Sequence, residues 1–254
     1  MLIINADDWG RNRAATDNII LCFKSRRITS ASAMLFMEDS QRAAELGLEH
    51  GLDAGLHLNF TIKFSKNVKW SKLYESQQRI ASFLNISKYC SILYNPLLKK
   101  DFHYVFNAQY DEYVRLYKKA PTHIDGHHHM HLCTNMLVDR LIPKGSKVRR
   151  NFSFFSGEKT ILNRFYRNII DKILMRRYTC TDYFFSIWPP WQTELMRRIV
   201  NLAKSQNVEL MMHPERKKEF EYLMSDEYFR IISLVGTGNY GSLQKKSSLM
   251  LCHR

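Results

Sequence analysis

Histidines are concentrated in one short part of the chain. Five of the ten histidines lie between positions 123 and 131, in the run HIDGHHHMH. Imidazole binds divalent metals and exchanges protons near neutral pH, whereas an apolar core has no need of such a run. In an extended segment, alternation would place Asp125, His127 and His129 on one face, with His128 pointing away. We therefore expect one metal ligand here, surrounded by other polar contacts.

A surface polyhistidine tract with adventitious metal affinity is the alternative interpretation of this run. Strand-like residues flank the run, an aspartate lies inside it, and it is internal to the chain. These features favour a functional site where a strand opens into a loop, the place at which α/β proteins carry their chemistry.

Two other strand-like runs carry polar residues that suit the same chemistry. Asp7 and Asp8 follow an apolar run at the N-terminus, and His57 lies within Gly55–Thr61. Two close carboxylates beside a cation can divide the work, one binding the metal and one accepting a proton. The alternatives are a helix-capping pair for the aspartates and a hydrogen-bonded core position for the histidine. Because the strand ends of a barrel converge on one face, the three runs together predict a metal-dependent hydrolase.

A further histidine follows the last clear strand of the sequence. His213 comes directly after Val208–Met212 and precedes Pro214. At the end of a strand on the same face, it is a candidate general acid. A packed histidine in a turn explains the sequence equally well.

Hydrophobic periodicity predicts alternating strands and helices, and hence parallel strands joined by crossover helices in a single (β/α) barrel-like domain over 1–254. The predicted strands are Leu2–Ala6, Thr29–Phe36, Ala54–Phe60, His123–Asp125, Lys147–Arg150, Tyr183–Trp188 and Val208–Met212. The predicted helices are Arg13–Arg27, Ser40–His50, Asp101–Lys119, Thr160–Arg177 and Thr193–Lys204, with another around Met136–Leu141. Residues 61–100 are less regular and are interpreted as a lid or insertion, while the tail 236–254 shows no strand or helix pattern.

Composition indicates a globular protein. The chain has 254 residues, of which 45% are hydrophobic, and a formal net charge of +14. Its five cysteines form no CxxC pair and no N-terminal signal peptide is evident, so we expect a reduced, cytoplasmic protein. The positive charge suits an anionic partner, but no nucleic-acid motif accompanies it and no apolar run reaches the roughly 20 residues of a membrane span. We expect neither a nucleic-acid nor a membrane partner.

Four motifs of this chain occur in a known order. The strings IINADDWG, GLHLNFT, PTHIDGHHHMH and LMMHPE resemble the signature blocks of the YdjC/ChbG carbohydrate deacetylases, from about residue 1 to 215. The resemblance implies a distorted TIM-like (β/α) barrel, a divalent metal, and hydrolysis of N-acetyl groups from amino sugars such as chitooligosaccharides, with release of acetate. It also implies a homodimer.

The resemblance also assigns roles to residues. The implied metal ligands are Asp8, His57 and His127. Asp7 is similar to the family's general base, His213 to its acid, and Asp125 to a carboxylate close to the metal. Beyond Pro214 the chain departs from the family, with a glutamate where glycine is common, so altered final barrel elements are expected.

The metal and the reaction class each leave alternatives. The family is associated with magnesium, whereas two histidines and one carboxylate favour zinc, iron or nickel. The same ligands would suit a phosphoesterase, and the basic charge leaves a nucleic-acid-binding protein as a more distant alternative. Candidate stacking partners for a sugar ring are Trp70, Trp188 and Trp191, with packing as the other interpretation.

Overall fold

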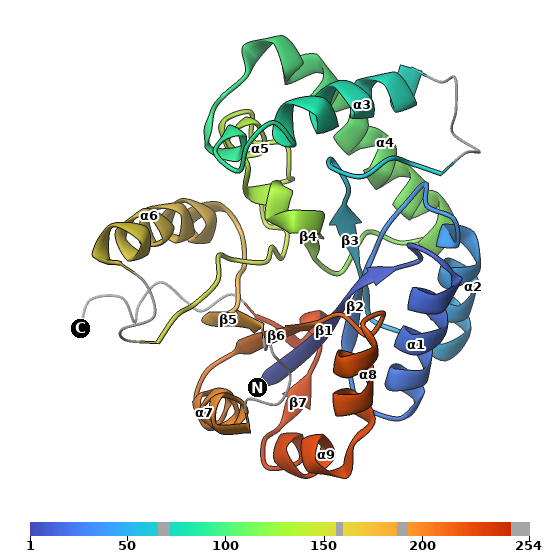
Figure 1. Cartoon of the computed structure of the whole chain (residues 1–254), viewed down its shortest axis with the longest axis vertical. Helices are drawn as coiled ribbons and strands as arrows, with labels where there is room; N and C mark the ends of the chain where they lie inside the picture. Colours follow the sequence, from blue (N-terminus) through green and yellow to red (C-terminus); the bar gives the residue numbers. More distant parts are fainter. Residues whose placement is uncertain (66–71, 156–159, 187–192, 245–254) are drawn as a thin grey trace.

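A parallel β-sheet runs through the middle of the molecule, with helices around its outer side (Figure 1). The computed structural model describes residues 1–65, 72–155, 160–186 and 193–244. In these residues the strand order is β4-β3-β2-β1-β6-β5, and β7 pairs with β1. The strands are β1 (Leu2–Trp9), β2 (Ser30–Ala33), β3 (Ala54–Leu58), β4 (Ile124–Gly126), β5 (Tyr183–Ser186), β6 (Val208–Met212) and β7 (Thr237–Gly238).

Every strand pair is parallel, and the first strand lies between the second and the sixth. The sheet therefore curves around β1 into a half-barrel, and all the strands deliver their carboxyl ends to one face. The helices are α1 (Arg13–Lys24), α2 (Ser40–His50), α3 (Lys72–Leu84), α4 (Lys99–Tyr117), α5 (Thr134–Val138), α6 (Ile161–Arg177), α7 (Thr193–Ala203), α8 (Lys217–Met224) and α9 (Asp226–Ile232). The predicted α/β distorted barrel is confirmed.

An extended segment bridges the two free edges of the sheet. Val148 forms an isolated bridge with Ile124 beside β4, and Lys147 forms one with Thr179. The amide of Ser153 then donates to the carbonyl of Phe184 in β5 at 2.8 Å. The predicted strand Lys147–Arg150 is thus wrong in detail, because these residues make single bridges to separate neighbours and form no continuous ladder.

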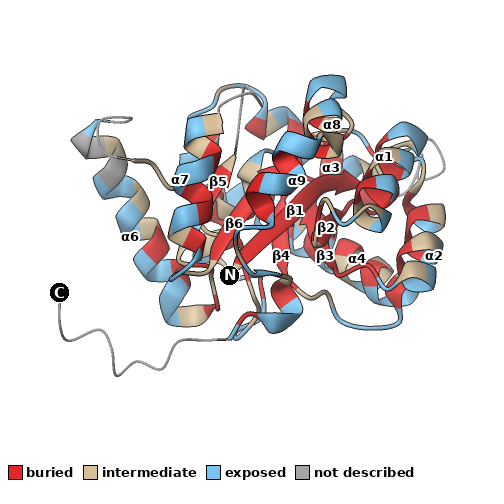
Figure 2. Ribbon diagram, turned by 90° about the horizontal axis from the view of Figure 1, so that it is seen from below, coloured by how far each residue is buried: buried red, intermediate tan, exposed pale blue. Residues whose placement is uncertain are grey.

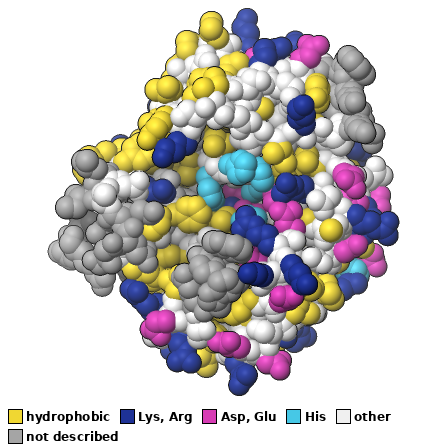
Figure 3. All heavy atoms as spheres, viewed as in Figure 1, with side chains coloured by type: hydrophobic (Ala, Val, Ile, Leu, Met, Phe, Trp, Pro, Cys, Tyr) yellow, Lys and Arg dark blue, Asp and Glu magenta, His cyan; other side chains and the backbone are white. Residues whose placement is uncertain are grey.

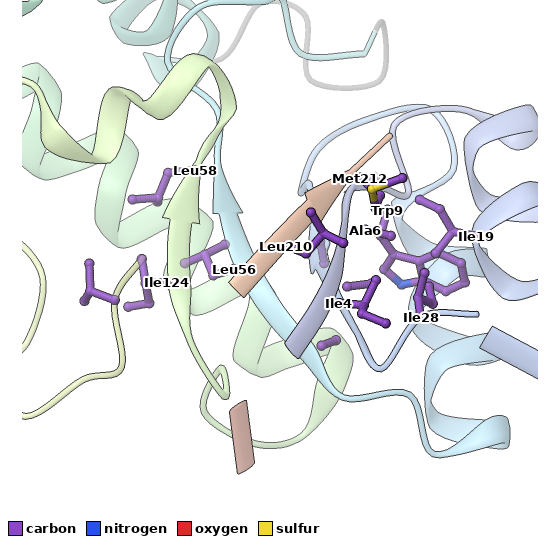
Figure 4. Packing of buried hydrophobic residues seen from close by; sticks show 14 of the residues in the cluster. Ile4, Ala6, Trp9, Ile19, Ile28, Leu56, Leu58, Ile124, Leu210 and Met212 are labelled. Carbon is purple, nitrogen blue, oxygen red and sulfur yellow. The ribbon is translucent and has the colours of Figure 1, made fainter. Parts of the chain in front are cut away.

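The hydrophobic core lies between the sheet and the helices. The residues of β1, β2, β3, β4 and β6 are buried along the whole strand, while the helices expose their outer faces (Figure 2). Ile4 and Ala6 of β1 and Leu210 of β6 are fully buried and pack with Ile19 of α1 (Figure 4). Gly51 ends α2 in the left-handed conformation, with φ 68°, which glycine adopts without steric cost.

Two regions have more regular structure than the sequence indicated. The described parts of residues 61–100 contain α3 and the short 3₁₀ turns Cys90–Ile92 and Pro96–Leu98. Helix α3 buries Ser76 and Gln77 beside its apolar residues, which weakens the hydrophobic pattern. The end of the chain, where altered elements were expected, forms α8, α9 and β7.

In the described part of the chain, no helix is both long and apolar enough to cross a bilayer.

Candidate metal centre

A cavity of about 380 Å³ lies at the carboxyl ends of the strands, and histidine side chains gather at a hollow on this face (Figure 3). Five of the predicted site residues line it, namely Asp7, Asp8, His57, His127 and His213. They come from the ends of β1, β3, β4 and β6, which the parallel sheet brings together. Asp125 of β4 is fully buried and does not line the cavity.

A distortion of β1 turns both aspartates toward this cavity. The register between β1 and β2 shifts between Ala6 and Trp9. Asp8, inside the shift, has φ 68°, a left-handed conformation that is uncommon for a residue other than glycine. Such strain persists where the surroundings impose it, often at functional sites. The capping alternative for the aspartates is wrong, because Asn12 caps α1 by accepting from the amide of Ala15.

Asp8, His57 and His127 bring three metal-binding atoms together. One ligand atom from each lies within 4.8 Å of the other two, and all three residues are buried. Asp8 Oδ1 is 2.9 Å from His127 Nδ1 and 3.5 Å from His57 Nε2. Burial raises the pKa of Asp8, but its hydrogen bonds to the two imidazoles outweigh burial and hold that pKa far below its usual range. One carboxylate and two imidazoles form a donor set that fits a divalent ion.

Asp125 fixes the orientation of His57. The imidazole donates from Nδ1 to Asp125 Oδ1 at 2.8 Å, which leaves Nε2 facing Asp8. A carboxylate behind a ligating histidine is a common feature of metal sites, because it sets the tautomer and the direction of the ring. Burial lowers the pKa of His57, but the charges of Asp125 and Asp7 raise it to about 10. The carboxylates around His57 therefore favour positive charge at this position.

A second group of possible ligands, Asp7, His57 and Asp125, lies in the same region. This group fits a cation less well, because a guanidinium already pairs with both of its carboxylates. Arg149 donates to the two oxygens of Asp7 at 2.7 and 2.8 Å and lies 2.7 Å from Asp125 Oδ2. In the group containing Asp8, the guanidinium contact is at Oδ2, from Arg11 at 3.3 Å, and Oδ1 faces the two imidazoles.

Sequence reasoning missed Arg149, which has no exposed surface. Its Nε donates to Glu209 Oε1 at 2.8 Å, so this one side chain joins three buried carboxylates. Burial lowers the pKa of Arg149, but the surrounding carboxylates raise it well above its usual value. Glu209 inside the apolar run Val208–Met212 was the available signal, because a carboxylate inside a core requires a partner.

His213 lies directly after β6, next to the loop that leads to α8. Its backbone amide donates to Glu219 Oε2 at 2.6 Å, which fixes the turn. Burial lowers the pKa of its imidazole to about 4, so the ring is neutral at pH 7. Glu215 pairs with Arg11 at 2.9 Å, and Arg11 also reaches Asp8 Oδ2 at 3.3 Å.

The histidine run is not extended after Gly126, so the predicted alternation is wrong there. It turns into a 3₁₀ helix, His127–Leu132, in which His128 and His129 have φ 53° and 60°. His131 points inward and donates from Nε2 to the carbonyl of Arg149 at 3.0 Å. The run thus contributes one candidate metal ligand, His127, and further histidines that lie near it, of which His128 and His129 line the same cavity.

Comparison with known proteins places this geometry in a family. Residues 1–233 match the family model described as YdjC-like protein. The chain belongs to the YdjC-like family. The resemblance seen in the four motifs is thereby confirmed.

Two relatives carry names that describe an activity. A carbohydrate deacetylase from Clostridium beijerinckii is 29% identical over 255 residues, which cover 91% of this chain and 94% of the relative. A chitooligosaccharide deacetylase from Proteus mirabilis is 30% identical over 145 residues, and this match spans about half of both proteins, 52% of this chain and 50% of the relative.

A solved structure shares the fold. A protein from Enterococcus faecalis V583, proposed to cleave cellobiose phosphate, superimposes with a TM-score of 0.68. The match covers 95% of this chain and 97% of that one at 21% identity, so it shows the architecture alone.

Proposed function

We propose that this protein is a metal-dependent carbohydrate N-deacetylase that releases acetate from acetylated amino sugars such as chitooligosaccharides. The observation that carries the proposal is the convergence of Asp8, His57 and His127 in one cavity, with the carboxylate of Asp7 beside them. The names of the YdjC-like relatives support the substrate class.

In the proposed site Asp8, His57 and His127 hold one divalent ion. Two imidazoles in the donor set favour zinc or another transition metal over the magnesium that the family resemblance implied. Such an ion supplies Lewis acidity, which polarises an amide carbonyl and makes water a better nucleophile.

Asp7 is the proposed general base. A carboxylate has roughly four acceptor positions, and Arg149 and Asn5 take up three on Asp7 through donors at 2.7, 2.8 and 3.0 Å. These contacts hold the carboxylate in one orientation at the cavity wall and leave it able to accept a proton from the attacking water.

His213 is the proposed general acid. Since the ring is neutral at pH 7, it takes up a proton from solvent before it donates one to the leaving nitrogen, and Asp7 afterwards returns to solvent the proton that it removed from the attacking water. The charges of Asp7 and Asp8 favour that protonation and partly offset the effect of burial. The products are acetate and a free amine, and Asp125 acts by holding His57.

A second cavity, of about 240 Å³, supports the proposal that the substrate is an oligosaccharide. His128 and His129 line both cavities, so the two lie side by side. Its volume is below the roughly 300–1,000 Å³ of sites for drug-sized ligands and suits a single sugar ring. Phe152 and Tyr166 line it, and we propose that they pack against a ring that is not deacetylated. The three tryptophans considered for this role lie outside the described residues.

The phosphoesterase alternative has less support. The two arginines that line the catalytic cavity both contact carboxylates, Arg11 with Glu215 at 2.9 Å and Arg216 with Glu219 at 3.0 Å. A site for a phosphate would be expected to keep such cations for its ligand. The cytoplasmic location, the homodimer and the role of residues 61–100 as a lid remain predictions.

Acetate release tests the proposal. The metal-loaded protein should release acetate from at least one N-acetylated sugar in a panel from N-acetylglucosamine to chitooligosaccharides, and mass spectrometry should show the loss of one acetyl group. EDTA should abolish the reaction and added metal should restore it. No acetate from any sugar, or hydrolysis of phosphate esters alone, would overturn the proposal.

A further inference from the structure

A chain of buried polar contacts runs from the candidate site toward the opposite end of the sheet. Glu209 on β6 has no exposed surface, and its two oxygens have different partners. Oε1 accepts from Arg149 Nε at 2.8 Å, and Oε2 accepts from the hydroxyl of Tyr240 at 2.5 Å. Branched apolar side chains usually fill such a barrel interior. A buried carboxylate held between a guanidinium and a phenol therefore suggests a specific role.

Tyr240 comes from the C-terminal segment, in which the sequence showed no pattern. Strand β7 pairs with Leu2 and Ile3 at the start of β1, which places this segment at the amino ends of the strands, away from the cavity. Residues 1–233 account for the family match, so Tyr240 lies beyond it.

Several contacts fix Tyr240 in this position. It is fully buried, and its amide donates to Asp53 Oδ2 at 2.9 Å. Its ring stacks on His123, with ring centroids 3.8 Å apart. A small apolar cluster of Ile3, Tyr240 and Leu243 closes this end of the sheet.

We propose that Tyr240 is a positioning residue of the candidate active site. Its hydroxyl holds Glu209 in the orientation that seats Arg149, and Arg149 in turn orients Asp7. A guanidinium is planar and rigid, so its Nε edge, on Glu209, and its Nη edge, on Asp7, move together. A small displacement of a catalytic carboxylate costs rate without changing substrate contacts. The catalytic part of this inference rests on the proposed function.

Tyr240→Phe tests the proposal, because it keeps the stacked ring and removes only the hydroxyl. Tyr228→Phe is the matched control, since Tyr228 is also fully buried and its hydroxyl donates one hydrogen bond, to the carbonyl of Arg27 at 3.0 Å. Tyr240→Phe should lower kcat about tenfold with KM unchanged, the size typical of supporting contacts behind a site. Tyr228→Phe should leave kcat and KM unchanged, although it should lose about as much stability as Tyr240→Phe.

A second readout separates this inference from the proposed function. The Arg149 Nε–H signal in a ¹H–¹⁵N spectrum of the metal-free protein should shift in Tyr240→Phe and stay in place in Tyr228→Phe. If neither the parent protein nor any variant releases acetate, the proposed function fails. The Arg149 Nε–H signal then still reports whether Tyr240 holds Arg149 in place.

The inference is overturned if the Arg149 signal is unmoved in Tyr240→Phe, or if kcat per folded molecule matches that of Tyr228→Phe. Should Tyr240→Phe fail to fold, Glu209→Gln is the second variant, because Glu209 lies between Tyr240 and Arg149 and contacts both. It should lower kcat by about 10- to 100-fold and shift the same signal. An unchanged kcat and an unmoved signal would also reject the proposal.

Discussion

Arg149 donates to both carboxylate oxygens of Asp7, at 2.7 and 2.8 Å, from a position with no exposed surface. The two residues are far apart in sequence and meet only because the segment around Val148 bridges the edge of β4. This pairing distinguishes the two aspartates. Asp7 is held by a guanidinium, whereas Asp8 faces two imidazoles, and the difference gives each a separate expected role.

Substitution of Asp7 should separate chemistry from metal binding. Asp7→Asn keeps the shape of the side chain but cannot accept the proton from water, so kcat should fall by about 10²- to 10⁴-fold. Metal content should be retained, whereas His57→Ala should lose metal and activity together. Metal analysis and steady-state kinetics on both variants would check this. Loss of metal from Asp7→Asn would mean that the roles of the two aspartates are exchanged.

Removal of Arg149 should destabilise the fold strongly. Arg149→Met would leave Asp7, Asp125 and Glu209 without their shared cation, and breaking a buried ion pair from one side costs about 3–5 kcal/mol. Urea denaturation would measure the loss. Arg115→Met is the control, because Arg115 pairs with Glu112 at the surface, where solvent screens the pair and its contribution to stability is small. Equal losses in the two variants would contradict the account.

Buried histidines should make the stability depend on pH. Burial lowers the pKa of His131 from 6.5 to about 4. Between those values the unfolded chain binds more protons at this position than the folded one does. The stability contribution is therefore complete above pH 6.5 and is lost as the pH falls toward 4, at about 1.4 kcal/mol per pH unit.

His131→Gln isolates this effect, because glutamine can keep the donor to the Arg149 carbonyl but does not titrate. With EDTA present, the variant should lose less unfolding free energy than the parent between pH 6.5 and 4.5. Glu209, whose pKa burial raises to about 7, acts in the opposite direction in both proteins, so the comparison removes its contribution. Identical pH profiles for the two proteins would reject the assignment to His131.

The second cavity should contribute to substrate length preference. Tyr166 lines this cavity with 44% of its surface exposed. Tyr166→Ala should raise KM for N-acetylated disaccharides several-fold and leave the kinetics of N-acetylglucosamine unchanged, since the single sugar occupies only the catalytic cavity. Phe165→Ala, in which the neighbouring side chain is 64% exposed and does not line the cavity, is the control. An equal change for both substrates would place the second ring elsewhere.

The sequence predicted the parts of the site that follow strands. Asp8 and His57 lie near the carboxyl ends of β1 and β3, and His127 directly follows β4. Parallel strands bring such positions together whatever the exact helix lengths. Arg149 was not predictable from its surroundings, because a short basic segment gives no indication which of its cations points inward. The contacts of Tyr240 depend on a tertiary fit between the last strand and the start of the first, for which a local pattern carries no signal.

Two of the predictions that failed did so for physical reasons that the structure shows. The alternation assumed for the histidine run required an extended backbone, but His128 and His129 adopt left-handed conformations and redirect it. Helix α3 escaped detection because it buries Ser76 and Gln77 among its apolar residues, and Gln77 donates to the carbonyl of Ile62 at 2.7 Å. Tertiary hydrogen bonds satisfied these polar groups in a way that periodicity does not reveal.

Metal analysis of protein purified without a polyhistidine tag, combined with X-ray absorption spectroscopy, is the decisive experiment on the proposed metal site. We predict one divalent ion per chain, bound by two imidazole nitrogens and a carboxylate oxygen, and loss of that ion in Asp8→Ala, His57→Ala and His127→Ala. A chain that binds no ion after incubation with zinc, magnesium or nickel, or that keeps its ion in all three variants, would contradict it.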